Sequence, residues 1–213
     1  MNNRHQKGPQ GVRGDRKSGS KFSNLTPFQP FYSATVKIYA KYFPQFGKGE
    51  VPLIRIEPTH DDFLFLITAS DIRTALGTVP VQYIRGLTAV LVPSGSKKQI
   101  TSMKDHFMHG EYWQSCIVLH PYPKVLMNRT YSRVPNPAAL QTYSRAGAKI
   151  VPKNEGLEVS FNIDSLRAFY LREVLIHEIG HHVMGPKRAA TKDSESFAKW
   201  FASEYGYRIQ QEA

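Results

Sequence analysis

Residues 175–184 contain the pattern in this chain that is best suited to chemistry. The stretch reads LIHEIGHHVM, with His177 and His181 four residues apart and Glu178 directly after the first histidine. On an α-helix, side chains four residues apart lie on one face, about 40° apart around the axis. Two imidazoles on one face can bind a single zinc ion, and the neighbouring glutamate can act as a base beside the metal.

The apolar surroundings of this pattern favour metal binding over a purely structural role. From Val174 to Met184 the helix is apolar on nearly every face, so we expect it to be buried. In the alternative interpretation, the two histidines are core residues that are hydrogen-bonded to the backbone. Imidazoles and a carboxylate are costly to bury without partners, however, and a metal ion supplies those partners. We therefore expect His177 and His181 to be zinc ligands.

A third protein ligand is needed, because a catalytic zinc ion has three protein ligands and one open position. Gly185 and Pro186 end the motif helix, and a final helix is expected to begin near residue 193. The carboxylates available on this final helix are Asp193, Glu195 and Glu204. Asp193 is the better cap, so Glu195 is predicted to bind the metal. The alternative role for Glu195 is only to favour the helix N-terminus, as acidic residues do.

The final helix supports this choice, because Ala198 and Phe201 follow Glu195 at positions that would pack on the motif helix. The combined pattern resembles the gluzincin branch of zinc metallopeptidases, especially the minigluzincins, in which a glutamate opens a second helix after the motif. The resemblance covers mainly residues 157–208. It implies a zinc-dependent endopeptidase in which His177, His181 and Glu195 bind the metal and Glu178 is the base.

Two positions depart from the gluzincin pattern. Larger gluzincins often place an aspartate four residues after the ligand glutamate, where it supports a ligand histidine, but this chain has Lys199 there. Support for the histidine must then come from elsewhere. The tyrosine or histidine that stabilises the transition state in the family also has no matching motif, and Tyr205, Tyr207 and His182 are the candidates. His182 lies about 100° around the helix from His181, so packing or a local hydrogen bond is its expected role.

The remaining residues predict an α+β fold, in which a small mixed or antiparallel sheet packs on the motif helix and the C-terminal glutamate helix, as in zincins. The expected strands are residues 34–43, 53–57, 63–68, 87–92, 112–119 and 157–161, and the first two are compatible with a hairpin. Helices are expected from Ser70 to Leu76 and from Asp164 to Met184, with a long loop at 121–156. We expect the substrate cleft between the motif helix and an edge strand, with 112–119 as that edge.

The chain divides into a tail and a single domain. Residues 1–24 are rich in glycine, serine, asparagine, glutamine and charge, which predicts a disordered basic tail. Residues 25–213 are predicted to form one zincin-like domain with an N-terminal β extension at about 25–60. The only cysteine, Cys116, excludes an intrachain disulfide and a cysteine-based zinc site. No apolar stretch is long enough to span a bilayer, so a cytoplasmic protein without a membrane partner is expected.

The charge balance suggests an acidic partner. The chain has 28 Lys and Arg against 17 Asp and Glu, a net charge of +11, and the tail contributes six basic residues and one acidic residue. A basic surface favours nucleic acid, anionic lipid or acidic proteins as partners, but for the tail a solubilising leader is preferred over a specific nucleic-acid arm. The predicted function is zinc-dependent hydrolysis of protein or peptide substrates with Glu178 as base. The alternative is a regulatory zinc-binding protein of the same fold that binds a protein partner or nucleic acid without general proteolysis.

Overall fold

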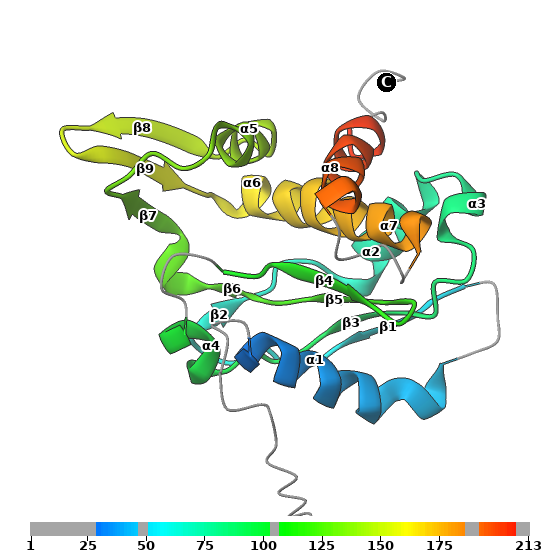
Figure 1. The fold of residues 1–213 in the computed structure, drawn as a ribbon. Coiled ribbons are helices and arrows are strands. Elements are labelled where there is room, and N and C mark those ends of the chain that lie inside the picture. The colour runs from blue at the N-terminus through cyan, green and yellow to red at the C-terminus, as the bar shows by residue number, and fades with distance from the viewer. Residues whose placement is uncertain (1–28, 47–50, 103–106, 186–191, 208–213) are drawn as a thin grey trace, which may run out of the picture.

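A four-stranded mixed sheet lies at the centre of the fold (Figure 1). The computed structural model describes residues 29–46, 51–102, 107–185 and 192–207, so the expected tail at 1–24 lies outside the described residues. The strand order is β1-β3-β5-β4, in which the first three strands are parallel and β4 is antiparallel to β5. These strands are β1 (Leu53–Ile56), β3 (Ala89–Val92), β5 (Cys116–Leu119) and β4 (Gly110–Trp113). The α+β class predicted from the sequence is confirmed.

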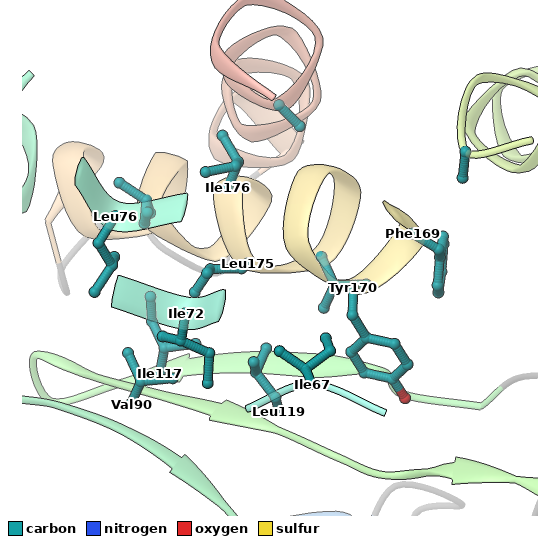
Figure 2. Packing of buried hydrophobic residues seen from close by; sticks show 14 of the residues in the cluster. Ile67, Ile72, Leu76, Val90, Ile117, Leu119, Phe169, Tyr170, Leu175 and Ile176 are labelled. Carbon is teal, nitrogen blue, oxygen red and sulfur yellow. The ribbon is translucent and has the colours of Figure 1, made fainter. Parts of the chain in front are cut away.

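Helices cover both faces of this sheet (Figure 1). The motif helix α7 (Leu175–Met184) lies on one face, and α1 (Gln29–Tyr42) lies on the other. Strands β3 and β5 are buried over their full length, as expected of parallel strands that are covered on both sides. The main core fills the space between the sheet and α7, where Ile72, Val90, Ile117 and Leu175 pack together (Figure 2).

The motif helix belongs to a continuous helical run over residues 163–184. It starts as α6 (Ile163–Ala168), continues through a π-helical segment, η3 (Phe169–Val174), and ends as α7. Asn162 caps it reciprocally with Ser165, so Asp164, which was expected to be the cap, lies in the first turn instead. Gly185, at φ +81°, ends the helix as predicted.

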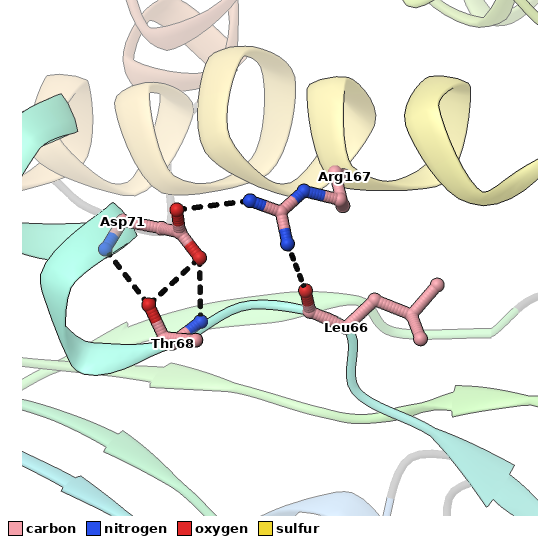
Figure 3. Close-up of polar contacts among 4 residues, drawn as sticks. All are labelled: Leu66, Thr68, Asp71 and Arg167. Carbon is pink, nitrogen blue, oxygen red and sulfur yellow. Dashed lines mark hydrogen bonds and ion pairs between the residues drawn. The ribbon is translucent and has the colours of Figure 1, made fainter.

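The crossover helix α2 (Ala69–Gly77) is tied to this long helix by polar contacts (Figure 3). Thr68 and Asp71 form a reciprocal cap at its start, so Ser70, which was expected to be the cap, lies inside the helix. Arg167 donates to Asp71 Oδ1 at 2.9 Å and to the carbonyl of Leu66 at 2.6 Å. These bonds fix the segment between β1 and β3 against the start of the motif helix.

The prediction of a strand at 34–43, paired as a hairpin with the next strand, is wrong. These residues lie in α1, and Phe31, Thr35 and Ile38 are buried at helical spacing. The expected N-terminal β extension is therefore α1, then a 3-10 turn, η1 (Phe43–Gln45), and then β1. β1 pairs with β3 instead and lies at a sheet edge, where the prolines on either side of it, Pro52 and Pro58, are tolerated.

The stretch expected to form one strand at 112–119 is a hairpin. β4 and β5 are joined at Gln114 and Ser115, whose φ angles are 49° and 61°. Positive φ at both central residues suits a tight hairpin turn, because this turn matches the twist of the strands. Of these two strands, only β4 lies at a sheet edge, so the expected edge is corrected to 110–113, and β5 lies inside the sheet.

The prediction of a long loop at 121–156 is also wrong. An antiparallel sheet of order β7-β9-β8 and a helix occupy most of it. Its prolines are compatible with these elements, because Pro137 starts the helix after the Asn136 cap and Pro152 lies on an edge strand. The remaining described elements are β2 (Phe63–Leu64), α3 (Val81–Ile84), α4 (Lys97–Ser102), β6 (Tyr122–Pro123), η2 (Lys124–Leu126), β7 (Asn128–Tyr131), α5 (Pro137–Arg145), β8 (Lys149–Lys153), β9 (Gly156–Ser160) and α8 (Lys192–Tyr205). No helix in the described ranges is long and apolar enough to cross a membrane.

Candidate metal centre and cleft

The candidate site depends on the close approach of α7 and α8. A Cβ atom on Gly180 would lie only 2.7 Å from the Cα of Ala198, so the two backbones touch at this point. Figure 1 shows α8 packed on the side of α7 that faces away from the sheet. As a result, the first turn of α8, which carries Glu195, lies beside the histidine face of α7. Asp193, which was expected to be the cap, lies within the helix.

The structure brings His177, His181 and Glu195 together, as the sequence predicted. The Nε2 atoms of the two histidines lie 3.1 Å apart. Glu195 Oε1 is 3.2 Å from His181 Nε2, and Oε2 is 3.6 Å from His177 Nε2. Two ligand atoms that each lie about 2.0–2.1 Å from a tetrahedral zinc ion are about 3.3–3.4 Å apart. The three side chains therefore fit a tetrahedral zinc site with one open position.

Ser194 provides the support for a ligand histidine that Lys199 cannot provide. The fully buried Ser194 Oγ lies 2.8 Å from Nδ1 of His181. When Nε2 faces a metal ion, Nδ1 carries the proton and can donate it to this hydroxyl, which fixes the ring orientation. Ser194 directly precedes Glu195, so one helical turn holds both a candidate ligand and the support of another candidate ligand. The sequence contained no spacing rule that would have identified it.

Glu178 lies buried beneath the edge strand. Only 6% of the residue is exposed, and a Cβ atom on Gly110 of β4 would lie 2.9 Å from its Oε1. Burial, with smaller contributions from Glu195 and Glu111, raises the pKa of the Glu178 carboxyl to about 8. A hydrogen bond from the Tyr112 amide opposes this rise in the pKa. Such a carboxyl can accept and release a proton near neutral pH, as a general base requires.

The three ligand side chains also differ in their affinity for protons. Burial and the neighbouring His181 and Lys199 lower the pKa of His177 to about 4, although Glu195 opposes them. Burial lowers the pKa of His181, but the hydrogen bond to Glu195 and the charges of Glu178 and Glu195 outweigh it and raise the pKa. The hydrogen bond with His181 lowers the pKa of Glu195. Glu195 is therefore a carboxylate at neutral pH, as metal binding requires.

A cavity of about 400 Å³ opens beside the metal centre. His177, Glu178 and Lys199 line one end of it, and the remaining walls come from β4, η3, α5 and α8. Arg145 lies on the α5 wall, where Glu173 holds it through two hydrogen bonds of 2.8 and 2.9 Å. The cavity is therefore a cleft that contains the candidate base and one candidate ligand.

The free edge of β4 borders this cleft. The amide of His120 donates to the carbonyl of His109, which sets the alternation of the β4–β5 ladder. In an antiparallel ladder every second residue directs its main-chain groups away from the partner strand. Gly110 and Tyr112 therefore turn their main-chain groups to the free edge, toward Glu178.

The expected transition-state donors do not lie in this cleft. Within the described ranges, the lining residues do not include Tyr205, Tyr207 or His182. The His182 ring lies 3.2 Å from the Tyr112 hydroxyl and 3.0 Å from a backbone carbonyl, which is the local hydrogen-bonding role expected for it. The Tyr207 hydroxyl donates to Glu173 at 2.6 Å.

Three cationic or histidine side chains among the described residues line the cleft and were not predicted to belong to the site, namely His109, Arg145 and Lys199. The spacing of Lys199 from Glu195, four residues along one helix, could have indicated its place.

Comparison with known proteins gives no family model, no curated protein and no solved structure that matches this chain. The function must therefore be inferred from the site itself.

Proposed function

We propose that this chain is a zinc-dependent peptidase that hydrolyses peptide bonds in protein or peptide substrates. The convergence of His177, His181 and Glu195 at ligand distances, beside the buried Glu178, carries the proposal. A purely structural zinc site has no use for a carboxyl whose pKa lies near neutrality next to the metal. This combination favours a hydrolase over a regulatory protein that only binds a partner.

In this proposal, His177, His181 and Glu195 hold the zinc ion, which, when bound, lowers the pKa of water and polarises the scissile carbonyl. Glu178 takes the proton of the attacking water on a carboxylate oxygen and delivers it to the departing amine. Its burial beneath β4 keeps bulk water from competing for that proton. Lys199, on the cleft wall beside His177, supplies a positive charge that can stabilise the developing oxyanion.

The edge strand supplies the means of substrate binding. An extended peptide can pair with the main-chain groups of Gly110 and with the carbonyl of Tyr112 and so add a strand to the sheet, whereas the amide of Tyr112 donates to Glu178. This pairing would bring a peptide bond over Glu178, because the Gly110 backbone lies directly against that carboxyl. A side chain next to the scissile bond would then enter the cavity of about 400 Å³ along η3 and α5.

Metal analysis and peptide hydrolysis together test the proposal. The purified wild type should contain about one zinc per chain and cleave an unfolded protein such as denatured casein. Glu178→Gln should keep the zinc and lose the activity, whereas His177→Ala and Glu195→Gln should lose both. Asp193→Asn is a matched control for Glu195→Gln, because it removes an exposed acid from the same helical turn. Zinc in the wild type with equal activity in wild type and Glu178→Gln would refute the proposed base.

A further inference from the structure

We propose that the chain has a second binding site, which takes a phosphate-bearing ligand of about nucleotide size. The site is a cavity of about 690 Å³ on the α1 side of the sheet, between α1 and the loop that follows β3. Sites for small molecules typically enclose about 300–1,000 Å³. The cavity is thus larger than a lone phosphate ion needs. The inference does not depend on the peptidase activity, because α7 and the metal centre lie on the other face of the sheet.

The path of the chain creates this cavity. After β1 the chain runs beside the loop that follows β3, because the amide of Glu57 donates to the carbonyl of Val92 and the amide of His60 donates to that of Ser94. The chain leaves β3 toward α4, which contacts α1 on the α1 side of the sheet (Figure 1). The cavity therefore lies between α1 and the connection from β3 to α4. Glu57, directly after β1, and residues 93–96, directly after β3, line the cavity at this point.

The cavity is strongly basic. Lys37 and Lys41 reach it from α1, and Lys97 and Lys98 reach it from α4. The only acid among the described lining residues, Glu57, is paired with Lys41. The other three lysines are exposed and form no ion pair within the described part of the chain. Three positive charges therefore surround one hollow, where a lysine ammonium acts as a point charge for phosphate.

The cavity also contains hydroxyl groups, and the loop after β3 has a fixed shape. Three serines line the cavity, namely Ser33, Ser94 and Ser96. The hydroxyls of Ser94 and Ser96 donate within the loop, so Ser33 is the serine that can donate to a phosphate oxygen. Gly95 has a φ of +86°, and the ring of Phe63 lies so close that an added Cβ would be 2.8 Å from it. Ser96 Oγ donates to the side chain of the fully buried Gln99 at 3.2 Å. The loop is thus held in place by the protein, which lowers the entropic cost of binding.

The combination of size and charge selects the ligand class. A cavity of this volume with three unpaired lysines suits a ligand that carries several negative charges close together, such as a diphosphate or triphosphate. Closely spaced phosphate groups occur both in a free nucleotide and in the backbone of a single nucleic-acid strand. The sequence alone gave no such indication, because the lysines come from segments about sixty residues apart and no phosphate-loop motif is present.

Binding of a fluorescent ATP analogue to the full chain, followed by anisotropy, tests this inference. The wild type should bind the probe saturably, and Lys37→Gln/Lys97→Gln should bind it about tenfold or more weakly. The control is Lys124→Gln/Lys149→Gln, which removes two exposed lysines outside the cavity, so that the control and the cavity variant have the same net charge. This control should bind like the wild type, and Lys98→Glu alone should reproduce the loss. Equal melting temperatures show that the variants remain folded.

Competition then identifies the source of the phosphate groups. Displacement of the probe by pyrophosphate, without displacement by a short single-stranded oligonucleotide, would indicate a free phosphorylated molecule. Displacement by the oligonucleotide at lower concentration than pyrophosphate would indicate a strand backbone, and either result supports the pocket. Equal weakening in the control pair would instead show that diffuse positive charge binds the probe, and this would overturn the inference. The absence of saturable binding to the wild type would do the same.

Discussion

At the scale of single residues, the candidate site depends on buried polar groups that satisfy one another. Burial raises the pKa of Glu178 to about 8, so the carboxyl is mostly protonated at neutral pH when no cation is near. A cation beside it favours the carboxylate. Metal binding is therefore expected to release a proton and prepare the base in one step. The same reasoning explains why a neutral hydroxyl, Ser194, can support His181 without adding further charge to this buried cluster.

Ser194 gives the sharpest prediction at this scale. Ser194→Ala removes the hydrogen-bond partner of His181 Nδ1 and should weaken zinc affinity by about 10- to 100-fold, the usual cost of losing such support. The measurement is a zinc competition titration with a fluorescent chelator. Ser196→Ala is the control, because its exposed hydroxyl only donates to the carbonyl of Lys192 on the same helix. Equal affinities in the two variants would show that the ring of His181 is oriented by other contacts.

At the scale of elements, the contact between α7 and α8 decides whether the metal ligands can meet. Gly180→Ala would place a methyl group 2.7 Å from the Ala198 Cα and 3.2 Å from the Phe201 Cβ, so the helices must separate. In an open helix the same change would stabilise by up to about 1 kcal/mol, but overpacking typically costs about 1–3 kcal/mol. We expect Gly180→Ala to lower the free energy of unfolding measured in urea and also to weaken zinc binding. Gly77→Ala should not destabilise, because nothing lies within 4 Å of its added Cβ.

The elements also show what the sequence can and cannot reveal. β3 and the motif helix were predicted because continuous apolar runs and the stop at Gly185 are local signals, whereas the expected cap at Asp164 was wrong. α1 was mistaken for a strand because its residues also alternate, and only the burial of Phe31, Thr35 and Ile38 against the sheet decides between the two periods. Glu195 could be predicted because it stands at the head of the helix that follows the motif, whereas the role of Ser194 depends on the spatial approach of two helices. The lysine cavity depends on the spatial approach of α1 and α4, which no local pattern encodes.

At the scale of the whole molecule, a buried histidine joins the sheet to the long helix. The His120 side chain is fully buried, its Nδ1 lies 3.3 Å from the Gln99 amide, and its carbonyl accepts from the Tyr170 hydroxyl. The Nε2 atom has no hydrogen-bond partner among the described residues. Burial lowers the pKa of this imidazole from 6.5 to about 3. The folded protein therefore holds His120 neutral at a point where the sheet, η3 and α4 meet.

This histidine should make the fold sensitive to acid. Because its folded-state pKa lies below the unfolded value, its contribution is fully present above about pH 6.5 and is lost as the pH falls toward 3. Between these two pH values the free energy of unfolding should fall by about 1.4 kcal/mol for each unit by which the pH is lowered. His120→Asn keeps an acceptor for Gln99 but cannot be protonated, so it should lose less stability between pH 7 and pH 5 in urea unfolding. This difference is independent of any packing cost of the substitution, which is the same at both pH values. His60→Asn, at a partly exposed histidine, is the control. An equal loss in wild type and His120→Asn would place the origin of acid sensitivity elsewhere.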